Sequence, residues 1–310
     1  MRTANFAFAL TAALAIALTG ASTRAGAQTL NASEPATVSQ VVDGTKVTVE
    51  YSRPRARGRT GLFGSEVTFG HVWTPGANQS TTLAVSKDVS INGHPVAKGK
   101  YSVWMVVAPG DWELVLDHDT TLYHTNGPSR RPGQVRFMIP KEHHPFTEVL
   151  TWSFPVVGTS GMVLTMQWDT VSVPLAIKVT PTFTTAVPPE AAQRVVGTYH
   201  WHDAPSASGN GAAPPGDSAS RHASAFTVRY TGRELHATLD PPLFGDPAYG
   251  EYILIRKAGD LYSLGRVDRG ELIEVIDYAT LQFSPANGRP KSFEVRGTDD
   301  ALWANGAIAP

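Results

Sequence analysis

From residue 45 onward, apolar and polar side chains alternate along the chain with a period of two. The pattern is clear at residues 45–51 and again at residues 162–168. Successive side chains of an extended strand point to opposite faces of a sheet, so this pattern predicts strands with one buried face. An apolar stripe with the 3.6-residue period of a helix is not evident over any helical length. The alternation therefore predicts β-sheets that need no helical layer to cover them.

Other stretches rich in β-branched and aromatic residues extend this prediction, with turn residues such as Asp43-Gly44 and Asn92-Gly93 between them. The further strands predicted for a first block are Ser80–Ser86, Tyr101–Ala108, Trp112–Asp117, Gln134–Ile139, Glu148–Phe154 and Val171–Val179. Many short strands without helices for parallel crossovers favour antiparallel pairing. We expect an all-β fold, with an antiparallel β-sandwich or barrel-like N-terminal domain over residues 34–180.

A second, smaller β-rich domain is predicted at residues 194–310, after a Pro-rich linker at residues 181–193. Residues 204–220, a run of Ala, Pro, Ser and Gly, have little to bury and are predicted to form a flexible loop. The strands expected in this domain are Val195–Trp201, Phe226–Tyr230, Glu234–Leu239, Tyr252–Arg256, Leu261–Gly265, Thr280–Phe283 and Lys291–Arg296. Glu271–Tyr278 is compatible with a strand or a short helix.

The first 27 residues have the pattern of a signal peptide. Arg2 is followed by an apolar run from Phe6 to Leu18, and Ala25-Gly26-Ala27 provides the small residues that signal peptidase recognises. The apolar run is too short to span a bilayer, and no later stretch reaches 18 uninterrupted apolar residues. We expect export to the periplasm or the medium, cleavage before Gln28, and no transmembrane segment in the mature chain.

Composition excludes several functional classes. The chain contains no cysteine among 310 residues, which removes disulfides, thiol nucleophiles and iron–sulfur clusters. Its formal net charge is −1, so there is no general electrostatic attraction to nucleic acid or to an anionic membrane. We therefore expect no nucleic-acid partner.

Four segments of the first block carry a family resemblance: VEYSRPRARGR at 49–59, GHVWTPGANQST at 70–81, KDVSING at 87–93 and GKYS at 99–102. Over roughly residues 36–179 the chain resembles the secreted bacterial family known as domain of unknown function 2911, although Pro75 departs from the usual pattern. The resemblance implies a compact, exported β domain and no assigned activity. The second block carries Gly197-Thr198-Tyr199, RELHATLDPP at 233–242 and DLYSLG at 260–265, and with these segments it resembles small accessory β domains of secreted hydrolases.

The arginine-rich segment of this signature is a candidate binding site. Arg53, Arg55, Arg57 and Arg59 alternate with small residues or proline, which in an extended segment would aim four guanidiniums to one side. With His71, Trp73 and Asn78 of the second motif, Arg53, Arg57 and Arg59 would form an anion or glycan surface. The alternative is structural: Arg53 pairs with an acidic group such as Asp88 to hold the loop, and the other arginines stay solvated.

Tryptophans and histidines provide the other candidate sites. Trp73, Trp104, Trp112, Trp152 and Trp168 could stack on sugars, but they lie within apolar alternation, and we expect at least three in the core. The histidines cluster as His118 with His124, as His143-His144, and as His200 and His202 beside Asp203. Two imidazoles on one strand face with a carboxylate can bind a metal, so His200, His202 and Asp203 are the alternative metal site.

Taken together, these patterns favour a non-enzymatic exported module that binds a small ligand, a glycan or an envelope protein, with no cofactor. The alternative is a metal-dependent or carboxylate-based hydrolase of an envelope polymer. Its carboxylates would come from Glu50, Asp88, Asp111, Glu113 and Asp117. A third interpretation makes both domains structural parts of an envelope complex.

Overall fold

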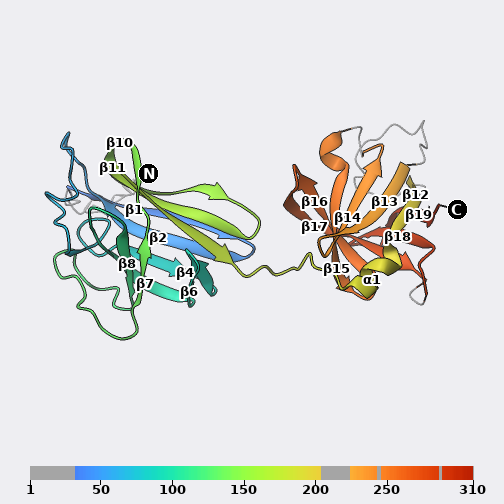
Figure 1. The fold of residues 1–310 in the computed structure, drawn as a ribbon, viewed down its shortest axis with the longest axis horizontal. Helices are drawn as coiled ribbons and strands as arrows, with labels where there is room; N and C mark the ends of the chain where they lie inside the picture. The colour runs from blue at the N-terminus through green and yellow to red at the C-terminus, as the bar shows by residue number, and fades with distance from the viewer. Residues whose placement is uncertain (1–31, 204–223, 243–245, 286–287, 310) are drawn as a thin grey trace, which may run out of the picture. The chain divides into compact units, whose positions relative to one another are not determined.

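A computed structural model describes residues 32–203, 224–242, 246–285 and 288–309 of the chain. The predicted signal peptide at residues 1–27 and the predicted flexible loop at residues 204–220 lie outside the described residues. The described residues form an all-β fold with two domains, which confirms the predicted fold class (Figure 1). Within the described ranges, no helix combines the length and the apolar character needed to cross a membrane.

The first domain is a sandwich of two antiparallel sheets. The larger sheet has the strand order β1-β2-β4-β7-β8-β9, with β3 paired to β7, and the smaller sheet has the order β10-β11-β5-β6. The strands are β1 (Glu34–Val42), β2 (Thr45–Arg53), β3 (Val72–Trp73), β4 (Thr82–Val85), β5 (Val89–Ile91), β6 (His94–Val96), β7 (Gly99–Val106), β8 (Trp112–Asp117), β9 (Val135–Ile139), β10 (Glu142–Val157) and β11 (Gly161–Val179).

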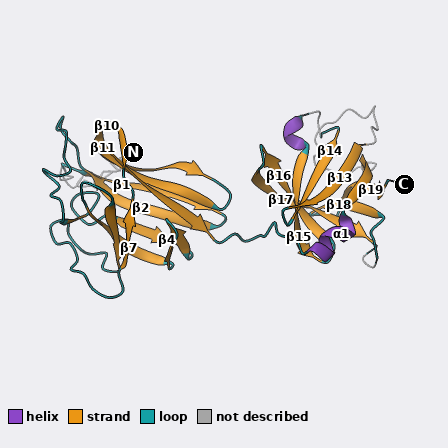
Figure 2. Ribbon diagram, in the orientation of Figure 1, coloured by secondary structure: helices purple, strands orange, loops and turns teal. Residues whose placement is uncertain are grey.

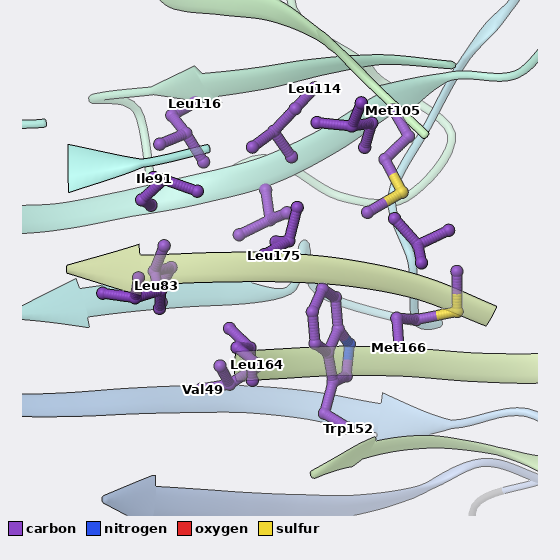
Figure 3. Close-up of a cluster of buried hydrophobic side chains, with 14 of the residues drawn as sticks. Val49, Leu83, Ile91, Met105, Leu114, Leu116, Trp152, Leu164, Met166 and Leu175 are labelled. Carbon is purple, nitrogen blue, oxygen red and sulfur yellow. The ribbon is translucent and has the colours of Figure 1, made fainter. Parts of the chain in front are cut away.

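The predicted alternation decides which side chains meet between the sheets. In β2, Val47, Val49 and Tyr51 are buried, while Lys46 and Glu50 face solvent. Side chains from β2, β4, β7 and β8 pack against side chains from β5, β10 and β11 (Figure 3). Four of the five tryptophans named above are buried, namely Trp104, Trp112, Trp152 and Trp168, which confirms that at least three belong to the core.

Strand β11 joins two predicted strands into one. The buried apolar residues are even-numbered up to Trp168 and odd-numbered from Val173 onward, so the apolar alternation changes phase between them. Asp169 lies at the change with a φ of 55°, where the pairing of β10 with β11 is irregular. One extra residue in a strand reverses the face to which every later side chain points. The bulge at Asp169 therefore turns the apolar side chains in the second half of β11 toward the core.

The second domain is a closed eight-stranded barrel in which each strand pairs with its neighbours in the chain and β19 pairs with β12 (Figure 2). A 3-10 helix, η2 (Pro247–Tyr249), precedes β15. The strands are β12 (Gly197–Asp203), β13 (Ser224–Thr231), β14 (Glu234–Asp240), β15 (Glu251–Ala258), β16 (Leu261–Asp268), β17 (Glu271–Ser284), β18 (Ser292–Gly297) and β19 (Leu302–Ile308).

Aromatic rings fill the barrel interior. Tyr199, Phe283 and Phe293 are fully buried, and their centroids lie 5.4–5.9 Å apart. Trp201 and Phe226 complete this cluster beside Phe293. Burial raises the pKa of Tyr199 to about 12, so its phenol stays neutral. An eight-stranded barrel is narrow enough for side chains of this size to fill it.

One short helix overlaps the end of the segment predicted as a linker and the first residue of the predicted strand Val195–Trp201. Helix α1 (Pro189–Val195) begins with proline at its first position and buries Ala191, Ala192 and Val195 against the barrel core. Arg194 donates hydrogen bonds to both carboxylate oxygens of Asp260, a buried residue in the turn between β15 and β16. The helix is only seven residues long, so its apolar residues make no more than two turns and give little periodic signal.

Several strands differ from the sequence-based prediction. Glu271–Tyr278, compatible with either structure in the sequence, is part of the long strand β17. Strands β1, β3, β5, β6 and β19 are not among the predicted strands. β5 and β6 have three residues each, too few for alternation to be recognised, and β19 contains Gly306, which weakens a strand pattern.

Asp169 provides a test of how the β11 bulge holds the first domain together. Its side chain is buried and accepts a hydrogen bond of 2.8 Å from the Leu62 amide. We expect Asp169→Ala to lower the free energy of unfolding by about 2 kcal/mol, because a buried N–H loses its acceptor. Asp169→Asn keeps an acceptor and tolerates the positive φ, and should lose less than half as much.

The measurement is urea unfolding followed by tryptophan fluorescence, since five of the seven tryptophans lie in the first domain. Equal losses in the two variants would show that the Leu62 hydrogen bond is not what the carboxylate contributes.

Candidate functional site

The arginine-rich segment after β2 bridges the two sheets of the sandwich. Leu150 N donates to Pro54 O at 3.0 Å, and Ala56 N donates to Glu148 O at 2.7 Å. Arg55 and Val149 form the β-bridge between these two bonds. The chain thus leaves β2 in the larger sheet and pairs with the edge of β10 in the smaller sheet, so this part of the family signature connects the two sheets.

Arg53 holds this bridge through its side chain. Its Nε donates to Leu150 O at 3.3 Å and its Nη2 donates to Thr151 Oγ1 at 2.9 Å. Asp88, the predicted partner, instead accepts a hydrogen bond from the Lys98 amide. The predicted Arg53–Asp88 pair is therefore wrong, because Asp88 belongs to the β5–β6 hairpin and Arg53 faces β10. The loop-holding role expected for Arg53 is the one its contacts provide.

An internal carboxylate occupies the backbone around Arg57. Arg57 and Gly58 have φ values of 55° and 71°, which turns their consecutive amides toward one point. Glu148 fills that point: its Oε1 accepts from Arg57 N at 2.7 Å and its Oε2 accepts from Gly58 N at 3.1 Å. Consecutive amides in such a turn form an anion-binding concavity. The anion bound by the Arg57 and Gly58 amides is thus the Glu148 carboxylate of the chain itself.

The four arginine side chains divide into two pairs. Arg53 contacts β10, and Arg59 forms an ion pair of 3.0 Å with Glu66 and donates to Ala56 O. Arg55 and Arg57 are exposed, and within the described residues their guanidiniums have no hydrogen-bond or ion-pair partner. Four guanidiniums aligned on one side, as the spacing predicts for an extended segment, are not formed, because the turn at Arg57–Gly58 ends the extended conformation.

The second motif packs directly on the first. Pro75 O accepts hydrogen bonds from Trp152 Nε1 at 3.1 Å and from Thr81 Oγ1 at 2.9 Å. A Cβ added to Gly76 would lie 2.4 Å from Thr81 Oγ1 and 3.4 Å from Ser52 O, so only glycine fits there. Pro75 departs from the family pattern. The two hydrogen bonds to its carbonyl oxygen fix it where the two motifs meet, called the junction below.

Asn78 ties the two motif loops together. It adopts a φ of 61°, and its Nδ2 donates to Ser33 O at 3.1 Å and to Ser52 Oγ at 3.4 Å. Ser52 directly precedes Arg53, so Arg53 and Asn78 lie at the same end of the sandwich. The two loops therefore form one surface, the condition that a shared site requires.

His71 and Trp73 differ in their exposure. His71 is exposed, and its amide donates to Thr68 O. Trp73 is half-buried in an aromatic cluster, stacked on Trp168 at 6.1 Å with Phe63 edge-on at 5.5 Å. Its ring faces are occupied by these neighbours, so Trp73 supports the loop that carries Phe63 and offers little area to a sugar.

A third loop, residues 118–134, joins this end of the domain, where the long loops gather in Figure 1. His124 N donates to Asn78 O at 2.8 Å and Ser80 N donates to Leu122 O at 2.9 Å. The exposed Tyr123 ring lies 4.6 Å from the ring of His124. The sequence indicated His118 and His124 as a histidine cluster, but it gave no sign that this loop borders the surface formed by Arg53–Arg59 and His71–Asn78, called the arginine surface below.

Asp117 anchors the third loop. Its buried carboxylate accepts from Arg131 at both oxygens, from Gln134 Nε2 at 2.7 Å and from Asp119 N at 2.8 Å. Burial alone would raise the pKa of Asp117, but these hydrogen bonds outweigh it and hold that pKa below its ordinary value. The carboxylate therefore stays charged at neutral pH, with all of its bonds used to position the loop.

Other carboxylates named for hydrolysis are also engaged. A hydrogen bond from Lys100 lowers the pKa of Glu50, and one from Arg136 lowers the pKa of Glu113. A general acid needs a raised pKa to hold its proton at neutral pH, which is the opposite direction. These two groups thus have the electrostatics of structural ion pairs.

The alternative metal site is only partly described. His200 is exposed on β12, while the side chains of His202 and Asp203 lie outside the described residues. Of the other histidines named above, His118 has its ring against Tyr101, and His144 Nδ1 lies 2.7 Å from Pro145 O. In the part of the chain that the structure describes, no three His, Asp or Glu side chains converge as a metal site would require.

Comparison with known proteins identifies the first domain. Residues 33–177 match the model of the family described as "Protein of unknown function (DUF2911)", over nearly the same range as the resemblance in the sequence. No curated protein and no solved structure matches the chain.

Glu148 provides a test of the internal anion. We expect Glu148→Ala to increase the rate of limited tryptic cleavage after Arg55, Arg57 and Arg59 by about tenfold, because two backbone amides lose their acceptor and the loop opens more often. Glu142→Ala, at the exposed start of the same strand, is the matched control and should cleave as the wild type does. Cleavage sites and rates are read by mass spectrometry, and equal rates in the two variants would contradict the assignment.

Proposed function

The domain formed by residues 33–177 is a member of the DUF2911 family, and from this premise we propose that the chain is an exported, non-enzymatic binding protein. Its ligand in this proposal is anionic, a small anion or an acidic glycan, and it binds at the loops that carry Arg53–Arg59 and His71–Asn78.

One observation carries this proposal: the two signature loops meet, and two guanidiniums on them have no partner among the described residues. Arg53, Arg59 and the amides at Arg57 are satisfied within the domain, which makes the surface rigid. Arg55 and Arg57 project from that rigid support with their side chains exposed. A guanidinium binds carboxylate, sulfate or phosphate through paired hydrogen bonds, and a fixed backbone lowers the entropic cost of forming them.

The hydrolase alternative has less support from the described carboxylates. Glu50, Glu113 and Asp117 are each held by a cation, and the pKa of each is lowered. Glycoside hydrolysis needs one carboxyl group that keeps its proton near neutral pH. Binding by exposed arginines requires no such group, which favours the binding proposal.

The proposed ligand site is tested with Arg55→Gln/Arg57→Gln. We expect the full mature chain to bind immobilised dextran sulfate in a salt-dependent manner, and the double variant to bind at least tenfold more weakly, since charge-assisted hydrogen bonds contribute about 1.5–3 kcal/mol each. The control is Arg229→Gln/Arg269→Gln, which removes the same charge from exposed positions of the barrel. Surface plasmon resonance gives the affinities. Equal loss in both double variants, or wild-type binding that does not depend on salt, would contradict the site.

Export is the second part of the proposal and rests on the leader pattern of residues 1–27. Expression with the native leader in a Gram-negative host should give a product in the periplasm or medium that begins at Gln28. Cell fractionation and N-terminal sequencing measure this. A cytoplasmic product that retains Met1–Ala27 would refute export. It would not affect the proposed ligand site, which the Arg55→Gln/Arg57→Gln variant tests separately.

A further inference from the structure

Two aromatic rings lie side by side on the outer surface of the barrel. Tyr278 of β17 and Trp303 of β19 are 49% and 45% exposed, and their ring centroids are 6.0 Å apart at an interplanar angle of 39°. The barrel places most of its aromatic side chains in its interior, so this pair is an exception. Adjacent aromatic side chains that are exposed on a sheet form a contiguous apolar surface, which makes them a candidate binding site.

The backbone holds this pair in position. Val295 pairs with Ala304 and Arg296 pairs with Leu302, so Trp303 is the extra residue of a bulge. A Cβ added to Gly297 would lie 2.8 Å from the Trp303 indole, which shows that the ring lies directly against a strand that has no side chain there. Thr298 N donates to Tyr278 O at 3.2 Å. Bulges often serve to re-aim a side chain, and here the result is a pre-positioned aromatic surface.

Polar side chains with fixed geometry border the two rings. Arg296 donates to Glu294 Oε2 through Nε at 3.0 Å and Nη2 at 2.8 Å, and its Nη1 donates to Asp300 O at 2.9 Å. In the strand register, Thr280 lies opposite Arg296 and Asn305 lies opposite Glu294. Alternation puts a guanidinium, a carboxylate, a hydroxyl and an amide on the outer face that carries the rings.

We propose that this surface, formed by Tyr278, Trp303, Arg296, Glu294 and Asn305, is a second binding site and that its ligand is a neutral polysaccharide. A pyranose ring presents a patch of C–H groups on its face, which packs on an aromatic ring, and hydroxyl groups around its rim. Those hydroxyls fit donors and acceptors held beside the rings, since fixed polar groups give specificity in such sites.

The local charge favours a neutral sugar over an acidic one. Asp277, Glu294, Asp299 and Asp300 outnumber Arg296 around the pair, so an acidic glycan or an anionic lipid surface would be repelled. The two rings form a small apolar area within a polar face, whereas a stable protein interface needs a larger apolar centre. The site therefore differs in domain, residues and ligand charge from the arginine surface, and it does not depend on the proposed function.

Affinity electrophoresis of the full mature chain tests this proposal. Native gels would contain laminarin, arabinoxylan, galactomannan or amylopectin as neutral probes, with dextran sulfate as the acidic one. We expect at least one neutral probe to retard the wild type. Trp303→Ala should weaken that retardation at least tenfold and Tyr278→Ala about threefold, because each substitution removes a stacking face. Ile273→Ala, at another exposed apolar residue of β17, is the matched control and should leave retardation unchanged.

Trp303→Phe keeps an aromatic face and should retain most of the binding, and it decides the result if Trp303→Ala fails to fold. Thermal unfolding of each variant checks the fold. Failure of all four neutral probes to retard the wild type overturns the proposal. So does equal weakening by Ile273→Ala and Trp303→Ala, or retardation by dextran sulfate alone that depends on Trp303. Retardation by dextran sulfate that depends on Arg55 and Arg57 belongs to the other site and leaves this one intact.

Discussion

Main-chain hydrogen bonds between the segment after β2 and the edge of β10 are the interaction on which the first domain depends. They let one chain segment belong to both sheets, so the sheets are connected by backbone as well as by side-chain packing. Buried or half-buried backbone groups that leave one sheet must find partners elsewhere, and Pro54, Ala56 and Arg57 find them on residues 148–150. The two signature motifs are best understood as the parts of this junction: Gly76 allows close approach, Pro75 O accepts two side-chain donors, and Asn78 closes the surface over Ser52.

The barrel provides partners for the backbone groups of its edge strands by closing on itself. Pairing β19 with β12 leaves its sheet without an open edge, and α1 adds apolar side chains to the core. Neither domain has a disulfide available, since the chain contains no cysteine. Stability must come from burial of large side chains, and both cores are rich in aromatic residues that bury much surface per residue. Tyr278 and Trp303 are exposed on the barrel, whereas most of the described aromatic side chains of this domain lie in its interior.

The arginine surface shows how far local spacing can predict a site. Arginines at alternate positions predict attraction for an anion, and Arg55 and Arg57 retain that property. The spacing carries no information about anions supplied by the chain itself. Glu148 is 91 residues from Arg57 in sequence, and only the pairing of the bridge with β10 brings its carboxylate to the Arg57 and Gly58 amides. The 118–134 loop was missed for the same reason, because its contacts with Asn78 and Ser80 join distant segments. Asp117 holds that loop through Arg131 and Gln134, which lie 14 and 17 residues further along the chain.

The amino-acid sequence alone determined the all-β class, the division into two β domains and the family of the first, because alternation, turn residues and motif letters are local properties of the chain. It also placed most of the strands and the buried tryptophans, whose positions follow from which residues share a face. Tertiary structure alone decided that two predicted strands join through the bulge at Asp169, that part of the linker becomes helix α1, and which arginines of the 53–59 segment stay exposed. These outcomes depend on long-range hydrogen bonds and on the closing of sheet edges. Such contacts are set by how the sheets meet and leave no periodic trace in the residues that make them.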